Sequence, residues 1–225
     1  MVEGSSYYVL YADDKRIHYL AAGPVNGPLI FFIHGWPGTA VTWKSQLDAF
    51  AAAEAQREID AVLGDHELPS WTDYERLPAV AMIAKEILRW RPPAPGLFPH
   101  SLTKDEELAG MRIPKGTAVV LNVWGIHHDP ERYPEPESFQ PSRFAGQTQL
   151  GSVYANSGDH TKRDHYGYGV GRRICPGIHL AERALFIAIA KLLWAFSVEH
   201  KLDTAGNPIP VDVSPSTAYS DGFLN

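Results

Sequence analysis

The pattern of hydrophobic and polar positions changes near residue 50. Residues 7–33 carry short apolar runs between turn residues, and the run LIFFI (Leu29–Ile33) lies between two glycine–proline turns. Five consecutive bulky apolar residues between turn signals are typical of a strand that is buried on both faces. From residue 51 the apolar spacing becomes helical. The pattern therefore predicts a short β-rich segment over 1–50, followed by a mainly helical region over 51–225.

Three helices are predicted in this second region. Residues 51–64 are rich in alanine, and Gly64 is placed to end the helix. Residues 79–90 have helical periodicity and are followed by Pro92-Pro93, which cannot continue a helix. Residues 184–196 are almost continuously apolar, so we expect this helix to belong to the core.

The segments between these helices have turn-rich or alternating patterns. Residues 101–123 predict a hairpin with its turn at Lys115-Gly116. Residues 125–144 contain four prolines, so we expect an ordered meander on the surface, without regular helix or central strand. Residues 146–164 read as a loop. The fold class expected from these elements is mainly α with small β-sheets (α+β).

Composition and charge exclude several classes of protein. The net charge is −6, whereas proteins that bind nucleic acids through phosphates need a basic surface. The apolar run 184–196 is shorter than the roughly 18–20 residues needed to cross a bilayer, so no membrane span is expected. The N-terminus lacks a cationic start before an apolar core, so no signal peptide is expected. A single cysteine excludes a disulfide framework and fits a reducing compartment.

That cysteine, Cys175, lies directly before the apolar helix. It could be an inert core thiol, a catalytic nucleophile or a thiolate that ligates a cofactor, because a structural zinc site normally needs more thiolates. Gly169, Gly171 and Gly177 let the backbone turn tightly and approach a flat ligand. Amides at the helix N-terminus favour the thiolate, and Arg173 can reach a carboxylate. This arrangement is what holding a haem requires: a thiolate for iron, close backbone and a cation for a propionate.

Further polar residues stand out beside it. Glu86 and Arg89 are three residues apart, so they share one helical face and can form a partly buried pair, with Arg143 as a candidate third partner. His127 and His128 are interpreted as structural or solvated. A zinc set remains a minor alternative, composed of Cys175, His160, His165 and His179.

These residues carry a family resemblance. The stretch Tyr168–Gly177 resembles the haem-binding signature F-x-x-G-x-R-x-C-x-G of cytochrome P-450 monooxygenases, with Tyr168 in place of the usual phenylalanine. Glu86–Arg89 matches the family's E-x-x-R, and Pro141–Phe144 matches its P-x-R-F. The motifs follow in the family's order over residues 54–225. The resemblance implies the proximal half of a cytochrome P-450 fold over 51–225.

The resemblance also implies an activity and site residues. It implies a haem-thiolate oxidoreductase that inserts oxygen from O2 into a small apolar substrate, with electrons from NADPH through a cytochrome reductase. Cys175 would ligate the iron of haem b as the catalytic and metal-binding residue. The other implied residues are Arg173 and His100 on the propionates, Tyr168, Gly169 and Gly177 in the cofactor loop, and Glu86, Arg89 and Arg143 as a structural network. Residues 94–100 and 214–224 would touch substrate, and Lys162, Arg163 and Arg172 would dock the reductase.

Parts of the family pattern are missing from this sequence. The A-G-x-D/E-T pattern of the helix that delivers protons to bound dioxygen is absent. Family members often reside on the endoplasmic reticulum membrane, but this sequence shows no anchor, so the localisation stays open. We expect a fused or truncated monooxygenase product, joined near residue 51. A degenerate, non-catalytic haem-binding protein is therefore a second possibility.

Residues 1–50 resemble the start of a different family. After the run Leu29–Ile33, the loop His34-Gly35-Trp36-Pro37 is similar to the H-G-x-P loop of α/β-hydrolases of the epoxide-hydrolase type. The nucleophile elbow G-x-S-x-G that should follow is absent, so hydrolysis of an epoxide or ester is disfavoured. This segment is expected to be a hydrolase-like N-terminal fragment.

Overall fold

The computed structural model describes residues 6–12, 15–21, 49–64, 66–196 and 203–207. The chain divides into two units, residues 1–46 with 211–225 and residues 47–210. In the first unit, β1 (Ser6–Ala12) pairs antiparallel with β2 (Lys15–Ala21), and Val9 lies opposite His18. The predicted strand 29–33, the H-G-x-P loop and the substrate turn 214–224 lie outside the described residues.

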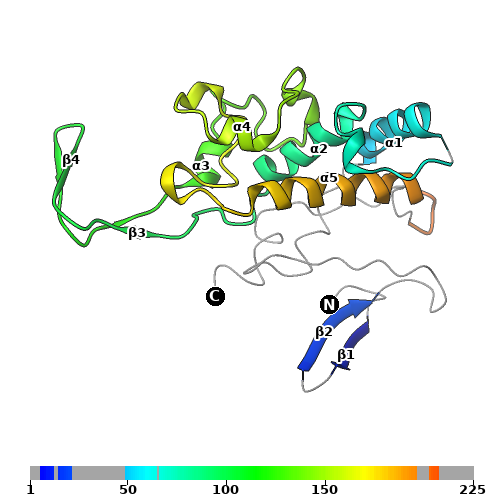
Figure 1. The fold of residues 1–225 in the computed structure, drawn as a ribbon, viewed down its shortest axis with the longest axis horizontal. Helices are drawn as coiled ribbons and strands as arrows, with labels where there is room; N and C mark the ends of the chain where they lie inside the picture. Colours follow the sequence, from blue (N-terminus) through cyan, green and yellow to red (C-terminus); the bar gives the residue numbers. More distant parts are fainter. Residues whose placement is uncertain (1–5, 13–14, 22–48, 65, 197–202, 208–225) are drawn as a thin grey trace. The chain divides into compact units, whose positions relative to one another are not determined.

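All three predicted helices are present in the second unit. They are α1 (Ala49–Leu63), α2 (Pro78–Trp90) and α5 (Ile178–Ala195). Helix α5 begins earlier than predicted, directly after the Cys175 loop. Helix α1 begins at Ala49, before the domain boundary that was expected between residues 50 and 51. Helix α5 packs against α1, α2 and the short α4 (Gly151–Ala155), as Figure 1 shows.

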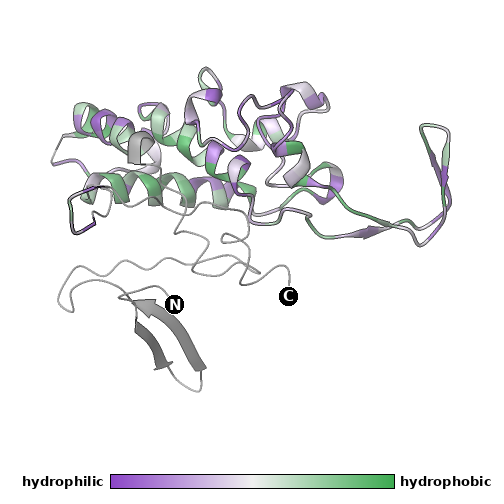
Figure 2. Ribbon diagram, turned by 180° about the vertical axis from the view of Figure 1, so that it is seen from behind, coloured by the Kyte–Doolittle hydropathy of each residue, from purple (hydrophilic) through white to green (hydrophobic). Residues whose placement is uncertain are grey.

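The core lies between these helices. Figure 2 shows that α5 is hydrophobic along most of its length, as its sequence predicts. Its inner face is buried, while Leu180 near its start is 75% exposed. Large apolar side chains that are buried in the core are Ile59, Leu63, Val80, Ile83, Ile87, Leu185, Phe186, Ile189 and Leu193. No helix in the described part of the chain is long and apolar enough to cross a membrane.

Local chemistry explains where α1 and α2 begin and end. Gly64 follows α1 with a φ of 64°, a left-handed conformation that glycine adopts without strain. Pro78 occupies the first position of α2, where its missing N–H costs no helical hydrogen bond. The next amide, Ala79 N, donates to Glu58 Oε2 at 2.9 Å, so α1 caps α2. Pro92 then ends the helix.

The region between α2 and α3 (Val123–His127) is an arm of two small sheets (Figure 1). Its strands are β3 (His100–Ser101), β4 (Glu106–Leu108), β5 (Met111–Ile113) and β6 (Ala118–Val119). The chain reverses at Ala109-Gly110, where both φ angles are positive, as a two-residue hairpin loop requires. The predicted reversal at Lys115-Gly116 was therefore wrong, although Gly116 does form a turn before β6.

The proline-rich meander is irregular, as predicted, but it is not confined to the surface. Helix α3 (Val123–His127) occupies its start and the 3-10 helix η3 (Pro141–Phe144) its end. His127, Tyr133 and Phe144 are buried, because the meander packs against α2. The predicted loop 146–164 likewise contains α4 and the 3-10 helix η4 (His160–Lys162).

Candidate functional site

Cys175 lies in a tight loop between the 3-10 helix η5 (Gly171–Arg173) and α5. Its amide donates to Tyr168 O at 2.9 Å, and its carbonyl accepts from Ile178 N at 3.3 Å. The loop is thus closed at its base and leads directly into the first turn of α5. Cys175 is a free, exposed thiol, so its sulfur is accessible to a ligand. The inert core thiol considered from the sequence is therefore ruled out.

Glycines give this loop its shape. Gly169 and Gly171 have φ angles of 82° and 60°, which side-chain-bearing residues rarely adopt. Gly177 has an ordinary φ of −84°, but a Cβ placed there would lie 3.8 Å from Cys175 Sγ. Two glycines therefore allow the turn, and the third keeps the space beside the sulfur free of side-chain atoms.

The other predicted cofactor residues differ in their exposure. Arg173 is exposed in η5, two residues before the cysteine. Tyr168 is buried against Ala155 and Ile178, and burial raises the pKa of its hydroxyl. His100 is exposed on β3, and among the described residues no hydrogen bond or ion pair joins its side chain to the Cys175 loop. The structure therefore brings the loop residues together but leaves His100 in the arm.

The predicted contact between Glu86 and Arg89 is present and fully buried. Arg89 Nε and Nη2 each donate to a different oxygen of Glu86, both at 2.7 Å, which makes a bidentate pair. Arg143 Nε reaches Glu86 Oε1 at 3.1 Å, and Gln140 N donates to the same oxygen at 2.8 Å. A buried ion pair needs such additional hydrogen bonds to offset its desolvation.

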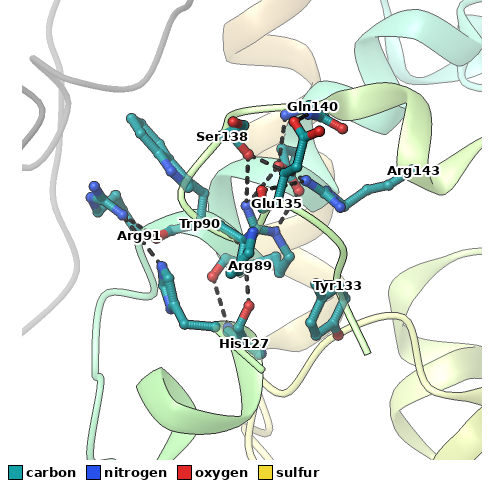
Figure 3. A network of polar contacts seen from close by, with 12 residues as sticks. Arg89, Trp90, Arg91, His127, Tyr133, Glu135, Ser138, Gln140 and Arg143 are labelled. Atoms are coloured by element: carbon teal, nitrogen blue, oxygen red, sulfur yellow. Dashed lines mark hydrogen bonds and ion pairs between the residues drawn. The ribbon is translucent and has the colours of Figure 1, made fainter. Parts of the chain in front are cut away.

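The two arginines also bind the backbone of the meander. Arg89 Nη1 donates to the carbonyl oxygens of His127 at 3.0 Å and Pro136 at 2.8 Å, while Nη2 lies 3.3 Å from Ser138 O. Figure 3 shows Arg89 between His127 and Ser138. Arg143 Nη1 donates to Pro134 O at 3.0 Å. The network therefore fixes a segment that has almost no regular secondary structure of its own.

His127, interpreted from the sequence as structural or solvated, is structural, because its ring is buried and both of its nitrogens are hydrogen-bonded. Its ring joins the carbonyl of Arg89 to the amide of Tyr166, at 2.9 and 2.7 Å. The signal in the sequence is Pro92-Pro93, since two prolines after a helix leave its last carbonyls without their usual amide donors. That signal shows the need for a donor but does not identify which residue supplies it.

A second buried charge cluster was missed. Lys85 Nζ lies 3.2 Å from Asp164 Oδ2 and donates to Gln149 O at 3.1 Å. Burial lowers the pKa of Lys85, and the charge of Asp164 opposes that shift. Glu182 of α5 accepts from Gly151 N. The cluster joins α2 and α5 to the loop that precedes Tyr168.

The zinc alternative has no support in the described part of the chain. No group of three or more His, Cys, Asp or Glu side chains is arranged there to hold a metal ion. His165 is fully buried beside Tyr168, with ring centroids 5.4 Å apart, whereas Cys175 is exposed. The thiol of Cys175 therefore stands as a single soft donor, which suits iron in a porphyrin better than a structural zinc.

The surroundings of Cys175 also fit a haem. A Cβ at Gly169 would lie 3.5 Å from Leu97, so the segment after α2 lies against the cysteine loop. The next residue in that segment, Phe98, is 56% exposed, and Leu180 in the first turn of α5 is 75% exposed. Exposed apolar side chains in the segments that adjoin a loop with an accessible thiol are suited to covering by a flat apolar ring.

Comparison with known proteins gives consistent matches. The model of the cytochrome P-450 family matches residues 51–216. Cytochrome P-450 monooxygenase anuE of Penicillium roqueforti is 73% identical over 173 residues, which cover 77% of this chain and 35% of that protein. Cytochrome P-450 monooxygenase yanC of Aspergillus niger is 55% identical over 170 residues, covering 76% of this chain and 32% of that protein.

Solved structures show the same likeness. A zebrafish cytochrome P-450 with progesterone superimposes with a TM-score of 0.56 and 34% identity, covering 66% of this chain and 32% of that one. Another, with abiraterone, gives a TM-score of 0.55 and 32% identity over 64% of this chain. The chain spans about a third of the length of the curated relatives it matches.

Proposed function

We propose, since this chain belongs to the cytochrome P-450 family, that it forms the haem-ligating part of a monooxygenase in which the thiolate of Cys175 would hold the haem iron. The observation that carries the proposal is the accessible thiol of Cys175 in a glycine-shaped loop at the start of α5. Cys175 lies two residues before Gly177, the N-cap residue of α5, so the thiol is presented at the N-terminal end of this helix.

A bound haem supplies the binding and activation of dioxygen at its iron. The residues of this chain contribute position and charge. Arg173, exposed beside the loop, and His100, exposed on β3, are proposed to hold the two propionate carboxylates. Tyr168, Gly169 and Gly177 shape the loop around the sulfur.

Glu86, Arg89 and Arg143 are proposed to hold the scaffold behind the loop. Their hydrogen bonds join α2 to the meander through backbone carbonyls. Because the meander packs on α2 and α2 packs on α5, this network fixes the base from which the cysteine loop extends. It touches neither substrate nor cofactor in this proposal.

Substrate and electron donor follow from the same proposal. The substrate is proposed to be a small apolar molecule, since the segment that lies against the loop at Leu97 carries the exposed apolar side chain of Phe98. Electrons are proposed to come from NADPH through a cytochrome reductase. The exposed cations Lys162 and Arg172, together with the partly buried Arg163, offer a docking surface for an acidic partner.

An absorption spectrum tests the ligation directly. The full chain is reconstituted with haem, reduced and exposed to carbon monoxide. A strongly red-shifted Soret band is expected, because a thiolate donates electron density to the iron. Cys175→Ala should abolish this band. A parent chain that stays colourless, or a band that survives in Cys175→Ala, would refute the assignment.

A further inference from the structure

The end of α2 leaves a carbonyl that its own helix cannot satisfy. Arg89 is the last residue but one of α2, and its carbonyl would accept from the amide of position 93. That position is Pro93, which has no N–H. His127 Nδ1 lies 2.9 Å from this oxygen and donates to it. Arg89 Nη1 in turn donates to His127 O at 3.0 Å, so two hydrogen bonds join the ends of α2 and α3.

The other ring nitrogen of His127 accepts a hydrogen bond from the segment that leads to Cys175. Tyr166 N donates to His127 Nε2 at 2.7 Å. A backbone amide can only donate, so Nε2 must carry a lone pair and the proton must be on Nδ1. The ring is fully buried, and burial lowers the pKa of His127 to about 2, which keeps the ring neutral and the acceptor available.

Tyr166 begins a short hydrogen-bonded path to the cysteine. Its carbonyl accepts from Gly169 N at 2.9 Å, at the start of the glycine turn. Tyr168 O then accepts from Cys175 N at 2.9 Å, which closes the loop at the residue that carries the thiol. The ring of His127 therefore joins the last turn of α2 to the base of the Cys175 loop.

We propose that His127 is a positioning residue whose acceptor nitrogen Nε2 holds the base of the Cys175 loop through the amide of Tyr166 and so sets the place of the sulfur. This inference rests on the proposed haem ligation for its functional meaning. It extends the Glu86–Arg89 network, because the same Arg89 that pairs with Glu86 also anchors the ring through its backbone carbonyl.

Two substitutions separate the two hydrogen bonds of the ring. In His127→Gln, the side-chain oxygen can replace Nε2 as the acceptor for Tyr166 N, although the bond to Arg89 O is lost. In His127→Asn, the side-chain amide nitrogen can replace Nδ1 as the donor to Arg89 O, but Tyr166 N loses its acceptor. Tyr133→Phe is a matched control, because it removes a 2.7 Å hydrogen bond to Asp164 O near the same loop and keeps the aromatic ring that packs edge-on against His127.

Amide hydrogen exchange in the haem-free full chain measures the position of the loop. In His127→Asn, exchange of the Tyr166 and Cys175 amides should accelerate by about tenfold or more, as expected for a lost buried hydrogen bond. In His127→Gln and Tyr133→Phe, exchange at Cys175 should stay within about threefold of the parent. Equal acceleration in the Asn and Gln variants, or in Asn and the Tyr133→Phe control, overturns the inference.

The haem-loaded chain gives a spectroscopic readout. The red-shifted carbon monoxide band should decay about tenfold faster in His127→Asn than in His127→Gln, because a loosened loop releases the thiolate. A parent chain without this band contradicts the proposed function, whereas amide exchange in the haem-free chain still decides the positioning. If the Asn variant does not fold, nitrogen NMR of His127 in the parent decides. A neutral ring with the proton on Nδ1 down to about pH 5 supports the inference, and a proton on Nε2 overturns it.

Discussion

At the scale of single residues, Arg89 stands out because its guanidinium is buried away from water and yet donates hydrogen bonds from all three of its nitrogens. It pairs with both oxygens of Glu86 and donates to carbonyls of three meander residues. A buried pair of this kind adds little net stability over an apolar replacement, but loss of one partner leaves a buried charge uncompensated. The network therefore specifies where the meander lies.

Arg89→Lys should lower the free energy of unfolding by about 3 kcal/mol, because a single ammonium cannot replace a planar fork that reaches a carboxylate and several carbonyls. Arg143→Lys is the matched comparison. Its side chain is 10% exposed, makes a 3.1 Å ion pair with one oxygen of Glu86 and donates its other bonds to carbonyls on the exposed side, so we expect a smaller loss of about 1 kcal/mol. Urea unfolding measures both. Equal losses in the two variants would show that the buried, multiply bonded guanidinium of Arg89 is no more important for stability than that of Arg143.

The buried ring of His127 makes the free energy of unfolding depend on pH. Burial lowers the pKa of His127 from 6.5 to about 2 in the folded chain, and the neighbouring His165 adds to the shift. Below pH 6.5 the ring of His127 therefore binds a proton in the unfolded chain but not in the folded chain. The contribution of the neutral ring is complete above pH 6.5 and is lost as the pH falls toward 2.

The free energy of unfolding should accordingly fall as the pH is lowered from about 6 to about 4, and His127 should contribute about 1.4 kcal/mol per pH unit to that slope. His127→Gln removes this titration, so its slope should be shallower by that amount. Unfolding at several pH values measures the difference. Parallel pH profiles for the parent and His127→Gln would show that the ring is not held neutral.

At the scale of elements, the left-handed conformation of the residue after α1 predicts that a side chain there lowers stability. Gly64 has a φ of 64°, and a Cβ placed there would meet nothing within 4 Å. Gly64→Ala should therefore destabilise the chain by about 1 kcal/mol through backbone strain alone. Gly158 is the control, since its Cβ would also meet nothing within 4 Å and its φ is not positive. Thermal unfolding that is equally affected by both substitutions would contradict this explanation.

Helices were the predictable elements, because apolar periodicity and terminal residues such as Gly64 and Pro92 act locally. The hairpin was placed wrongly, since Lys115-Gly116 and Ala109-Gly110 both contain glycine and local sequence does not rank them. Spacing alone predicted the contact of Glu86 with Arg89, and Arg143 followed from its motif. The carbonyls that Arg89 binds could not be predicted, because their direction depends on how an irregular segment packs against α2.

At the scale of the whole molecule, the net charge is −6, yet the exposed residues Lys162, Arg172 and Arg173 lie before Cys175 in the sequence. Opposite charge on a partner speeds encounter more than it tightens binding, and salt screens the effect. The proposed docking surface is therefore expected to change the rate at which the reductase associates more than the affinity of the complex.

Arg172→Glu should slow reductase-dependent reduction of the haem iron several-fold at low salt and less at high salt, as stopped-flow absorbance can measure. Reduction by a small chemical reductant should be unaffected, which serves as the control. An unchanged enzymatic rate at low salt would remove Arg172 from the docking surface.

The proposed bond between the sulfur of Cys175 and the haem iron can be tested without any substitution. Because the chain has one cysteine, growth on cysteine that carries a heavy sulfur isotope labels a single thiol. Resonance Raman spectroscopy of the oxidised, haem-loaded chain should then show an iron–sulfur stretching band that moves to lower frequency with the heavy isotope. A haem-loaded chain with no isotope-sensitive band would mean that Cys175 is not the ligand.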